Sequence, residues 1–148
     1  SKLNNVSNTN IPLIYGYWGS GINITDGNYT FFWYPDNDVD KELNNYTLMP
    51  MHMRSFFSEE ELQGSKLYSE FKFTKGMPVL KVPYMKKKKN QNIMSNINNA
   101  SVLFDISNDP VQLNPIEDQK LIKNMKNQIF QKITELEAPK ELLNRFKI

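Results

Sequence analysis

Cysteine is absent from this chain of 148 residues, and histidine occurs only once, as His52. Without cysteine the chain can form no disulfide, no thiolate zinc site and no cysteine nucleophile. One histidine cannot build a histidine-rich metal site or a catalytic histidine pair. The lack of cysteine is compatible with a reducing compartment, so we predict a cytoplasmic location.

Charge of one sign and long apolar runs are also missing. The 18 lysines and arginines nearly balance the 16 aspartates and glutamates, which gives no indication of nucleic-acid binding. No apolar run approaches the roughly 18 residues of a membrane span, and the start of the chain lacks the apolar core of a signal peptide. We therefore expect neither nucleic acid nor a membrane as partner.

The length suits one domain with a core of its own. We assign residues 1–10 as a polar lead and residues 11–148 as that domain. Since the first residue is not Met and the polar lead runs directly into an apolar segment, we expect the chain to be cut from a longer protein.

Motifs for nucleophilic catalysis and phosphate binding are incomplete. Ser20 lies between two glycines without the full Gly-x-Ser-x-Gly pattern, and the glycines of residues 16–19 lack a following Lys-Ser/Thr pair. Acidic residues alternate over positions 36–40, but the glycine and the closing glutamate of a calcium loop are missing. The sequence therefore predicts no catalytic site within this chain.

The first half of the chain favours β-strands. Residues 11–18 are mostly apolar, and residues 22–25 and 29–34 flank Asp26 and Gly27. That pair predicts a β-hairpin with a type I′ turn and positive φ at both positions. The outgoing arm is apolar on both faces, so we expect a central strand or one covered on both sides.

Shorter elements follow. Strands are predicted at residues 46–49, 67–73, 79–82 and 102–106. Pro78 and Pro83 bracket the third of these, which predicts a short or edge strand. Ser58 and Glu61 have the spacing of a capping box and open a predicted helix at residues 59–63.

A long helix closes the sequence. Asn114 is the predicted cap, Pro115 the first helical residue and Glu117 the third. Apolar residues recur at helical spacing and predict the buried stripe: Leu121, Ile122, Met125, Ile129, Ile133 and Leu136. Pro139 begins a last short helix that runs to Phe146.

These elements predict an α+β fold in which an antiparallel sheet of about four strands packs one face against the long C-terminal helix. Residues 86–101 interrupt it with a polar run rich in lysine and asparagine. We interpret this run as a solvated loop, with a patch for an anionic glycan or a phosphate backbone as the alternative.

One polar and aromatic segment, residues 46–55, could bind a substrate. Arg54 can place its guanidinium fork on sulfate, phosphate or carboxylate, and His52 would share its face if the backbone is extended. The alternative is that Arg54 pairs with a glutamate of the next helix. Trp18 could stack on a sugar ring if it lies on the surface rather than in the core.

Four segments together resemble motifs of one known family. Residues 103–115, LFDISNDPVQLNP, are similar to the family's closing signature. Residues 16–30 and 46–55 are similar to the G-x-x-G-x-x-V-N-V-T-D-G-R-Y-T and Y-T-L-M-P-x-H-M-R-S runs of a bacterial subgroup, with Asn28 in place of the usual Arg. Residues 137–139 match its tail. This set resembles the sulfatase family, which is related to the alkaline phosphatases, and the resemblance extends in order over nearly all of residues 11–148.

The resemblance implies the C-terminal domain of a sulfuric ester hydrolase. Sulfatases have a large catalytic domain with a formylglycine nucleophile and a bound calcium, but the C/S-x-P-S/A-x-R motif and the paired metal carboxylates are absent here. The smaller C-terminal domain of the family is a four-stranded antiparallel sheet packed on a long helix. This chain would then hydrolyse nothing alone and would pack against an N-terminal catalytic domain. His52, Arg54 and Trp18 are its predicted contacts with an anionic sulfate-ester substrate.

Two other functions remain open. The chain could be a free-standing binding module for an anionic glycan, using Trp33, Tyr34 and the lysines of residues 86–89. It could also be the tail of a related phosphatase, because sulfate and phosphate esters share tetrahedral anionic geometry. A domain that normally packs on a partner should expose a large apolar patch, whereas an independent module should not.

Overall fold

The computed structural model describes residues 11–16, 18–35, 43–52, 54–84 and 100–146. Its contacts divide the chain into two compact units. The first unit comprises Ser1–Pro35 with Asn99–Glu135, and the second comprises Asp36–Asn98 with Leu136–Ile148. Nearly all of the predicted loop at residues 86–101 lies outside the described residues.

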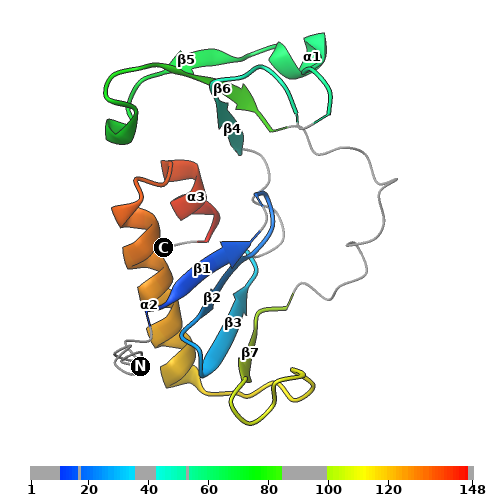
Figure 1. Cartoon of the computed structure of the whole chain (residues 1–148), viewed down its shortest axis with the longest axis vertical. Coiled ribbons are helices and arrows are strands. Elements are labelled where there is room, and N and C mark those ends of the chain that lie inside the picture. The colour runs from blue at the N-terminus through cyan, green and yellow to red at the C-terminus, as the bar shows by residue number, and fades with distance from the viewer. Residues whose placement is uncertain (1–10, 17, 36–42, 53, 85–99, 147–148) are drawn as a thin grey trace, which may run out of the picture. The chain divides into compact units, whose positions relative to one another are not determined.

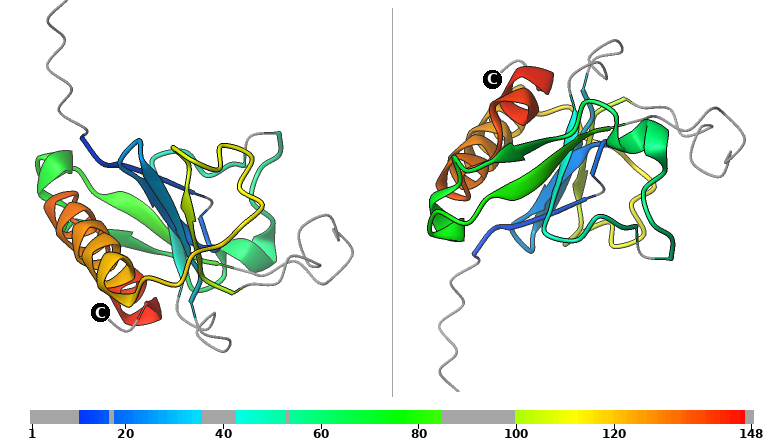
Figure 2. Two further views of the ribbon diagram at one scale, coloured as in Figure 1. Left: turned by 90° about the horizontal axis from the view of Figure 1, so that it is seen from below. Right: turned by 90° about the horizontal axis from the view of Figure 1, so that it is seen from above.

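The predicted α+β class is confirmed. The first unit contains strands β1 (Leu13–Gly16), β2 (Ile22–Thr25), β3 (Tyr29–Trp33) and β7 (Val102–Asp105) and the helix α2 (Gln119–Glu135). The strands form a four-stranded antiparallel sheet, sheet A, in the order β1-β2-β3-β7. Figure 1 and Figure 2 show α2 lying along this sheet.

Register in sheet A gathers the apolar residues on one face. Phe31 of β3 lies opposite Ile24 of β2 and Leu103 of β7, and all three side chains are fully buried. Side chains alternate along a strand, so Trp33, two residues after Phe31, faces the same way and lies under the Lys126 ammonium of α2 at 4.9 Å. The outgoing arm of the hairpin is therefore the central strand that the sequence predicted.

Helix α2 covers that face with Met125, Ile129 and Ile133, which are buried at helical spacing. Leu121 and Ile122 are half-buried. Leu136 was predicted to continue the stripe, but this was wrong, since it follows the helix end and is 62 % exposed. Three consecutive turns of α2 thus supply the helix side of the core.

The start of α2 also differs from the prediction. The helix begins at Gln119, and the Oδ1 atom of Asp118 accepts hydrogen bonds from the backbone N–H groups of Lys120 and Leu121 at 3.0 and 2.9 Å. Asp118 is therefore the cap. Asn114 instead donates its backbone N–H to the Asp109 carboxylate at 2.7 Å, so it belongs to the preceding loop.

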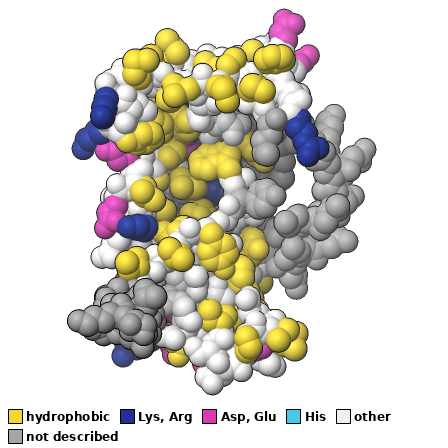
Figure 3. Space-filling view, in the orientation of Figure 1, with side chains coloured by type: hydrophobic (Ala, Val, Ile, Leu, Met, Phe, Trp, Pro, Cys, Tyr) yellow, Lys and Arg dark blue, Asp and Glu magenta, His cyan; other side chains and the backbone are white. Residues whose placement is uncertain are grey.

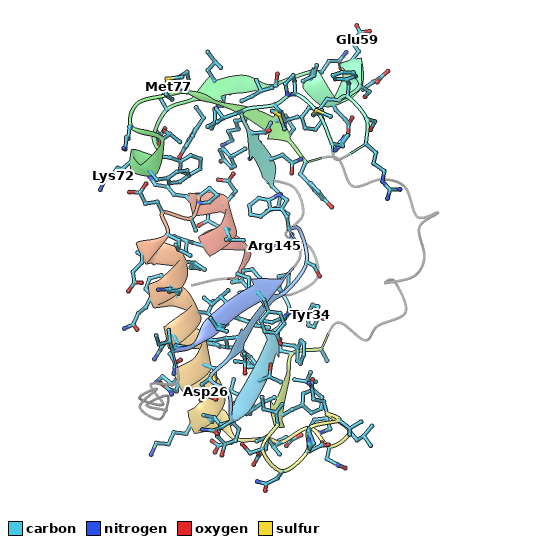
Figure 4. All side chains as sticks on the ribbon, in the orientation of Figure 1. Asp26, Tyr34, Glu59, Lys72, Met77 and Arg145 are labelled. Atoms are coloured by element: carbon cyan, nitrogen blue, oxygen red, sulfur yellow. The ribbon has the colours of Figure 1, made fainter. Side chains whose placement is uncertain are left out.

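The β2–β3 hairpin is confirmed, but its turn type is not. Gly27 has φ 90°, whereas Asp26 does not have a positive φ. The Asp26 N–H donates to the Tyr29 carbonyl at 3.2 Å, so the two residues between them are the central pair of the turn. Positive φ at the first of this pair, Gly27, and not at the second is the pattern of a type II′ turn. The Asp26 carboxylate (Figure 4) accepts the backbone N–H groups of Asn28 and Tyr29 at 2.9 and 2.8 Å, which fixes the loop.

Strand β1 is shorter and more exposed than the apolar run at residues 11–18 suggested. Among the described strands it pairs with β2 alone, at an edge of sheet A. Leu13 and Tyr15 are exposed, while Ile14, opposite the buried Ile24, is half-buried. Strand β1 is therefore a partly covered edge strand.

The second unit has a three-stranded antiparallel sheet, sheet B, in the order β4-β6-β5. Its elements are β4 (Asn44–Thr47), α1 (Glu59–Leu62), β5 (Lys66–Tyr68), the 3-10 helix η2 (Lys72–Thr74), β6 (Val79–Pro83) and α3 (Lys140–Arg145). The capping box of Ser58 and Glu61 is confirmed at the start of α1.

Three predicted strands of this unit are corrected. The first, at residues 46–49, begins two residues earlier and ends at Thr47. The predicted strand at residues 67–73 is divided into β5 and η2. The predicted strand at residues 79–82 was expected to be short or at an edge; β6 has five residues and is the central strand of sheet B. Pro83 is compatible with this position because it is the last residue of the strand.

Replacing Ile129 with Ala should lower the free energy of unfolding by about 2 to 5 kcal/mol, because the side chain is fully buried between α2 and sheet A. Urea unfolding followed by far-UV circular dichroism measures the change. The neighbouring Phe130, 40 % exposed on the same helix, is the control, and Phe130→Ala should cost much less. Equal losses would contradict this assignment of the core.

Replacing Asp118 with Ala should destabilise α2 by about 1 kcal/mol, because two N–H groups of the first turn lose their acceptor. Asn114→Ala keeps the backbone N–H that binds Asp109 and should lower the free energy of unfolding by a few tenths of a kcal/mol at most. A larger loss from Asn114→Ala than from Asp118→Ala in thermal unfolding would restore the cap predicted from the sequence.

Candidate functional site

The segment predicted to bind substrate forms a tight turn in the second unit. Met51 and Phe56 form an antiparallel bridge, and the His52 N–H donates to the Ser55 carbonyl at 2.7 Å. The Phe57 N–H donates to the Pro50 carbonyl at 3.3 Å. His52 is therefore hydrogen-bonded back to Ser55 across a turn and does not belong to an extended strand, so the condition for a strand face shared with Arg54 is not met.

His52 pairs with a carboxylate. Its Nε2 atom lies 2.8 Å from Oε1 of Glu61 in α1, and the Phe57 ring packs edge-on at 4.5 Å between ring centroids. The side chain of His52 is about one-third exposed, and that of Glu61 is mostly buried. From the sequence, a glutamate of this helix was an alternative partner for Arg54. In the structure that glutamate, Glu61, pairs with His52.

The Glu61 carboxylate is itself held in place. Its Oε2 atom accepts the Ser58 N–H at 2.9 Å, and the Ser58 hydroxyl accepts the Glu61 N–H at 3.3 Å. These two bonds are the capping box. One carboxylate therefore connects the start of α1 to the histidine of the turn.

Arg54 lies at the tip of the turn and is exposed. Within the described ranges no hydrogen bond or ion pair engages its guanidinium. An exposed guanidinium can bind an anionic oxygen through two parallel N–H groups. The geometry thus leaves Arg54 available to an anion.

Trp18 is 40 % exposed and belongs to the first unit, after the edge strand β1. The aromatic residues of the alternative glycan site differ from it. Trp33 is buried in the core of sheet A and cannot stack on a sugar, while Tyr34 is half-buried. The lysines at residues 86–89 lie outside the described residues.

A second polar cluster in this unit was not found from the sequence. The Glu141 carboxylate of α3 accepts the Tyr46 hydroxyl at 2.5 Å and the Asn44 amide at 2.9 Å. The Lys81 ammonium lies 3.8 Å from the same oxygen and 5.5 Å from the ring centroids of Tyr46 and Tyr68. These contacts fasten α3 to sheet B.

Strand register brings the partners of Glu141 together. Tyr46 lies opposite Lys81, and Asn44 lies two residues from Tyr46, so all three face the same way. Glu141 is about 95 residues away along the chain. No local pattern could have revealed this cluster, because it depends on the pairing of β4 with β6 and on the docking of α3.

Burial and hydrogen bonding shift the two acidic groups in opposite directions. Burial, followed by the hydrogen bond to the Glu141 carboxylate, raises the pKa of Tyr46 well above its ordinary value of 10.0. Burial would also raise the pKa of Glu141. The donors Tyr46 and Asn44, the helix backbone and the Lys81 charge outweigh it and hold that pKa below its usual 4.5.

The remaining features of the described residues are weaker candidates for a binding or catalytic site. A pocket of about 160 Å³ lies in the first unit, between residues of β1 and β2 and the last turns of α2, where Lys132 and Glu135 form a surface ion pair at 3.2 Å. Among the described residues, no group of three His, Asp or Glu side chains could hold a metal ion. None of the described helices is long and apolar enough to cross a membrane.

Comparison with known proteins returns no match: no protein-family model, no curated protein and no solved structure matches this chain. The function is therefore argued from the chain's own residues.

Replacing Tyr46 with Phe should lower the free energy of unfolding at neutral pH by about 1 to 3 kcal/mol, since a mostly buried carboxylate loses a donor. The bond needs an ionised Glu141 and a protonated Tyr46. Because the pKa of Glu141 is lowered on folding, its contribution is full above about pH 4.5 and is lost as pH falls through the folded value. Because the pKa of Tyr46 is raised, its contribution declines above pH 10.0.

Urea unfolding of the wild-type and Tyr46→Phe proteins across pH should therefore show the largest difference between these two limits. Tyr15→Phe, which removes a hydroxyl bonded to Thr30 in the first unit and no carboxylate partner, is the matched control. A Tyr46→Phe difference that is independent of pH would contradict the role of Glu141.

Proposed function

We propose that this chain is the C-terminal domain of a sulfatase-family hydrolase, which completes the fold of the parent enzyme and the rim of its substrate pocket. The observation that carries the proposal is the arrangement of sheet A and α2. The resemblance implies a four-stranded antiparallel sheet packed on a long helix, and this is the architecture of the first unit.

The segments that carry the resemblance are neighbours in this sheet. The run at residues 16–30 supplies β2 and the start of β3, and the closing signature at residues 103–115 supplies most of β7. Strands β3 and β7 pair directly, with Phe31 opposite Leu103. Two motifs separated by some seventy residues thus form one structural element, which favours common ancestry over two chance matches.

Polar residues of the closing signature have definite structural roles. The Asp105 carboxylate accepts the backbone N–H groups of Ser107 and Asn108, both at 3.1 Å, and the Asn108 amide at 2.9 Å. Asp109 accepts the Asn114 N–H in the same loop. The signature therefore specifies the turn that leads from β7 to the helix. This structural role does not require any residue of the signature to be catalytic.

Exposed apolar side chains also favour a domain that packs on a partner. Fifteen large hydrophobic residues are exposed in the described chain. Four of them, Leu48, Met49, Met51 and Phe56, lie together on the turn segment of the second unit, and Leu48 and Phe56 are each more than 70 % exposed. Figure 3 shows hydrophobic side chains gathered over the segments that form sheet B. An independent module would be expected to show fewer.

In this proposal the N-terminal catalytic domain supplies the formylglycine nucleophile and the calcium, and this chain supplies contacts to the anionic sulfate ester. Arg54 would bind an anionic oxygen and His52 a neighbouring polar group. Trp18 belongs to the first unit, and its contact with a sugar face stays a prediction from the sequence. The cytoplasmic location stays a prediction from the composition. The alternative of a free-standing glycan module is weakened because Trp33 is buried in the core and cannot contact a sugar. The alternative of a phosphatase parent is tested by the choice of substrate in the assay below.

Purified chain should be inactive on generic aryl sulfates and aryl phosphates. Mixed with a separately expressed catalytic domain of the parent, it should restore sulfate-ester turnover. The two substrates distinguish a sulfatase from a phosphatase parent. Turnover by the chain alone would overturn the proposal, because it would require a nucleophile that the sequence lacks.

Within the reconstituted enzyme, Arg54→Ala should raise KM for a sulfated sugar about tenfold, the equivalent of one charge-assisted hydrogen bond. Lys75→Ala, which removes an exposed cation elsewhere in the second unit, is the control and should leave KM unchanged. Normal turnover after both Arg54→Ala and His52→Ala would show that these residues do not contact the substrate at the pocket rim.

A further inference from the structure

We infer that Glu61 is the positioning residue of the His52–Arg54 turn. It holds the His52 ring in one orientation and one tautomer, so that Nδ1 remains to accept a hydrogen bond from a hydroxyl of an anionic saccharide. The identity of the ligand rests on the proposed function, whereas the effect of Glu61 on the ring does not.

The tautomer follows from the donors and acceptors. An ionised carboxylate only accepts hydrogen bonds, so the His52 Nε2 atom, 2.8 Å from Glu61 Oε1, must carry a proton. In the neutral ring Nδ1 is then bare and can only accept. No described residue contacts Nδ1 with a hydrogen bond.

The carboxylate is fixed at a second point. Glu61 Oε2 accepts the Ser58 N–H at 2.9 Å, so the side chain bridges the helix cap and the histidine. On the other side, the Phe57 ring packs edge-on against the imidazole at 71°. The hydrogen bonds of the turn hold the backbone of His52. The ring is therefore constrained by a carboxylate, an aromatic ring and its own backbone.

This arrangement suits a particular class of ligand. A bare ring nitrogen accepts a hydrogen bond from a hydroxyl, and the exposed Arg54 guanidinium two residues later binds an anionic oxygen. A sugar that carries a sulfate or phosphate ester has both groups. A free inorganic anion has no hydroxyl donor when fully ionised and would engage Arg54 alone.

The single histidine makes the test direct. In the nitrogen-15 spectrum of this chain, recorded at a mildly alkaline pH where histidine is ordinarily neutral, only His52 gives imidazole signals. We expect one protonated nitrogen, Nε2, and one bare nitrogen, Nδ1. In Glu61→Ala the two signals should move toward each other, as both tautomers become populated.

Two variants serve as controls. Ser58→Ala removes the other half of the capping box but keeps the bond from Glu61 to His52, so it should weaken α1 without changing the tautomer. Glu59→Ala removes an exposed carboxylate from the same helical turn (Figure 4) and should also leave the ring unchanged. An unchanged ring in Glu61→Ala, or an equal change in Ser58→Ala, would overturn the positioning role.

Titration with glucose 6-sulfate, glucose 6-phosphate and glucose then tests the ligand. We expect the charged sugars to shift Nδ1, with about tenfold weaker binding in Glu61→Ala, the loss of about one oriented hydrogen bond. A preference between sulfate and phosphate identifies the ester. If the tautomer is fixed but no charged sugar shifts Nδ1, or if glucose binds equally well, the ligand and the proposed pocket rim are wrong. The positioning of His52 by Glu61 would still stand.

Discussion

The pairing of β3 on both of its edges is the constraint on which the first unit depends. It places Phe31 between Ile24 and Leu103, and these three buried side chains form the surface that α2 covers. Because side chains alternate along a strand, a slip of β3 by one residue would turn Phe32 toward the helix and Phe31 away from it. The core, the position of α2 and the path of the closing signature all follow from this register.

In the second unit a buried charge has the corresponding role. Glu141 is mostly buried, and it is tolerated because a hydroxyl, an amide and an ammonium surround one of its oxygens. This requirement orients α3 on sheet B more strictly than apolar contacts would, since hydrogen bonds are directional. The Glu61 carboxylate does the same on a smaller scale, joining α1 to the turn that carries His52.

Local patterns predicted the elements better than their ends. Asp26-Gly27 identified the hairpin, but Asp26 precedes the central pair of the turn: its side chain accepts two backbone N–H groups, and Gly27 has the positive φ. Asn114 had the spacing of a cap, yet its N–H binds Asp109, and the nearer Asp118 caps α2. In both cases a carboxylate competes for the backbone donors of a turn, and spacing alone does not show which residue wins.

Local sequence patterns predicted the α+β class, the central hairpin strand, most of the apolar stripe of α2 and the capping box, because each arises from residues close in the chain. They also identified His52 and Arg54 as neighbours in a polar segment. Three other features are visible in the three-dimensional structure alone: Glu61 pairs with His52 rather than with Arg54, Trp33 is buried, and Glu141 binds Tyr46, Asn44 and Lys81. These contacts join separate elements, and their geometry is fixed by strand register and helix docking, which no local pattern encodes.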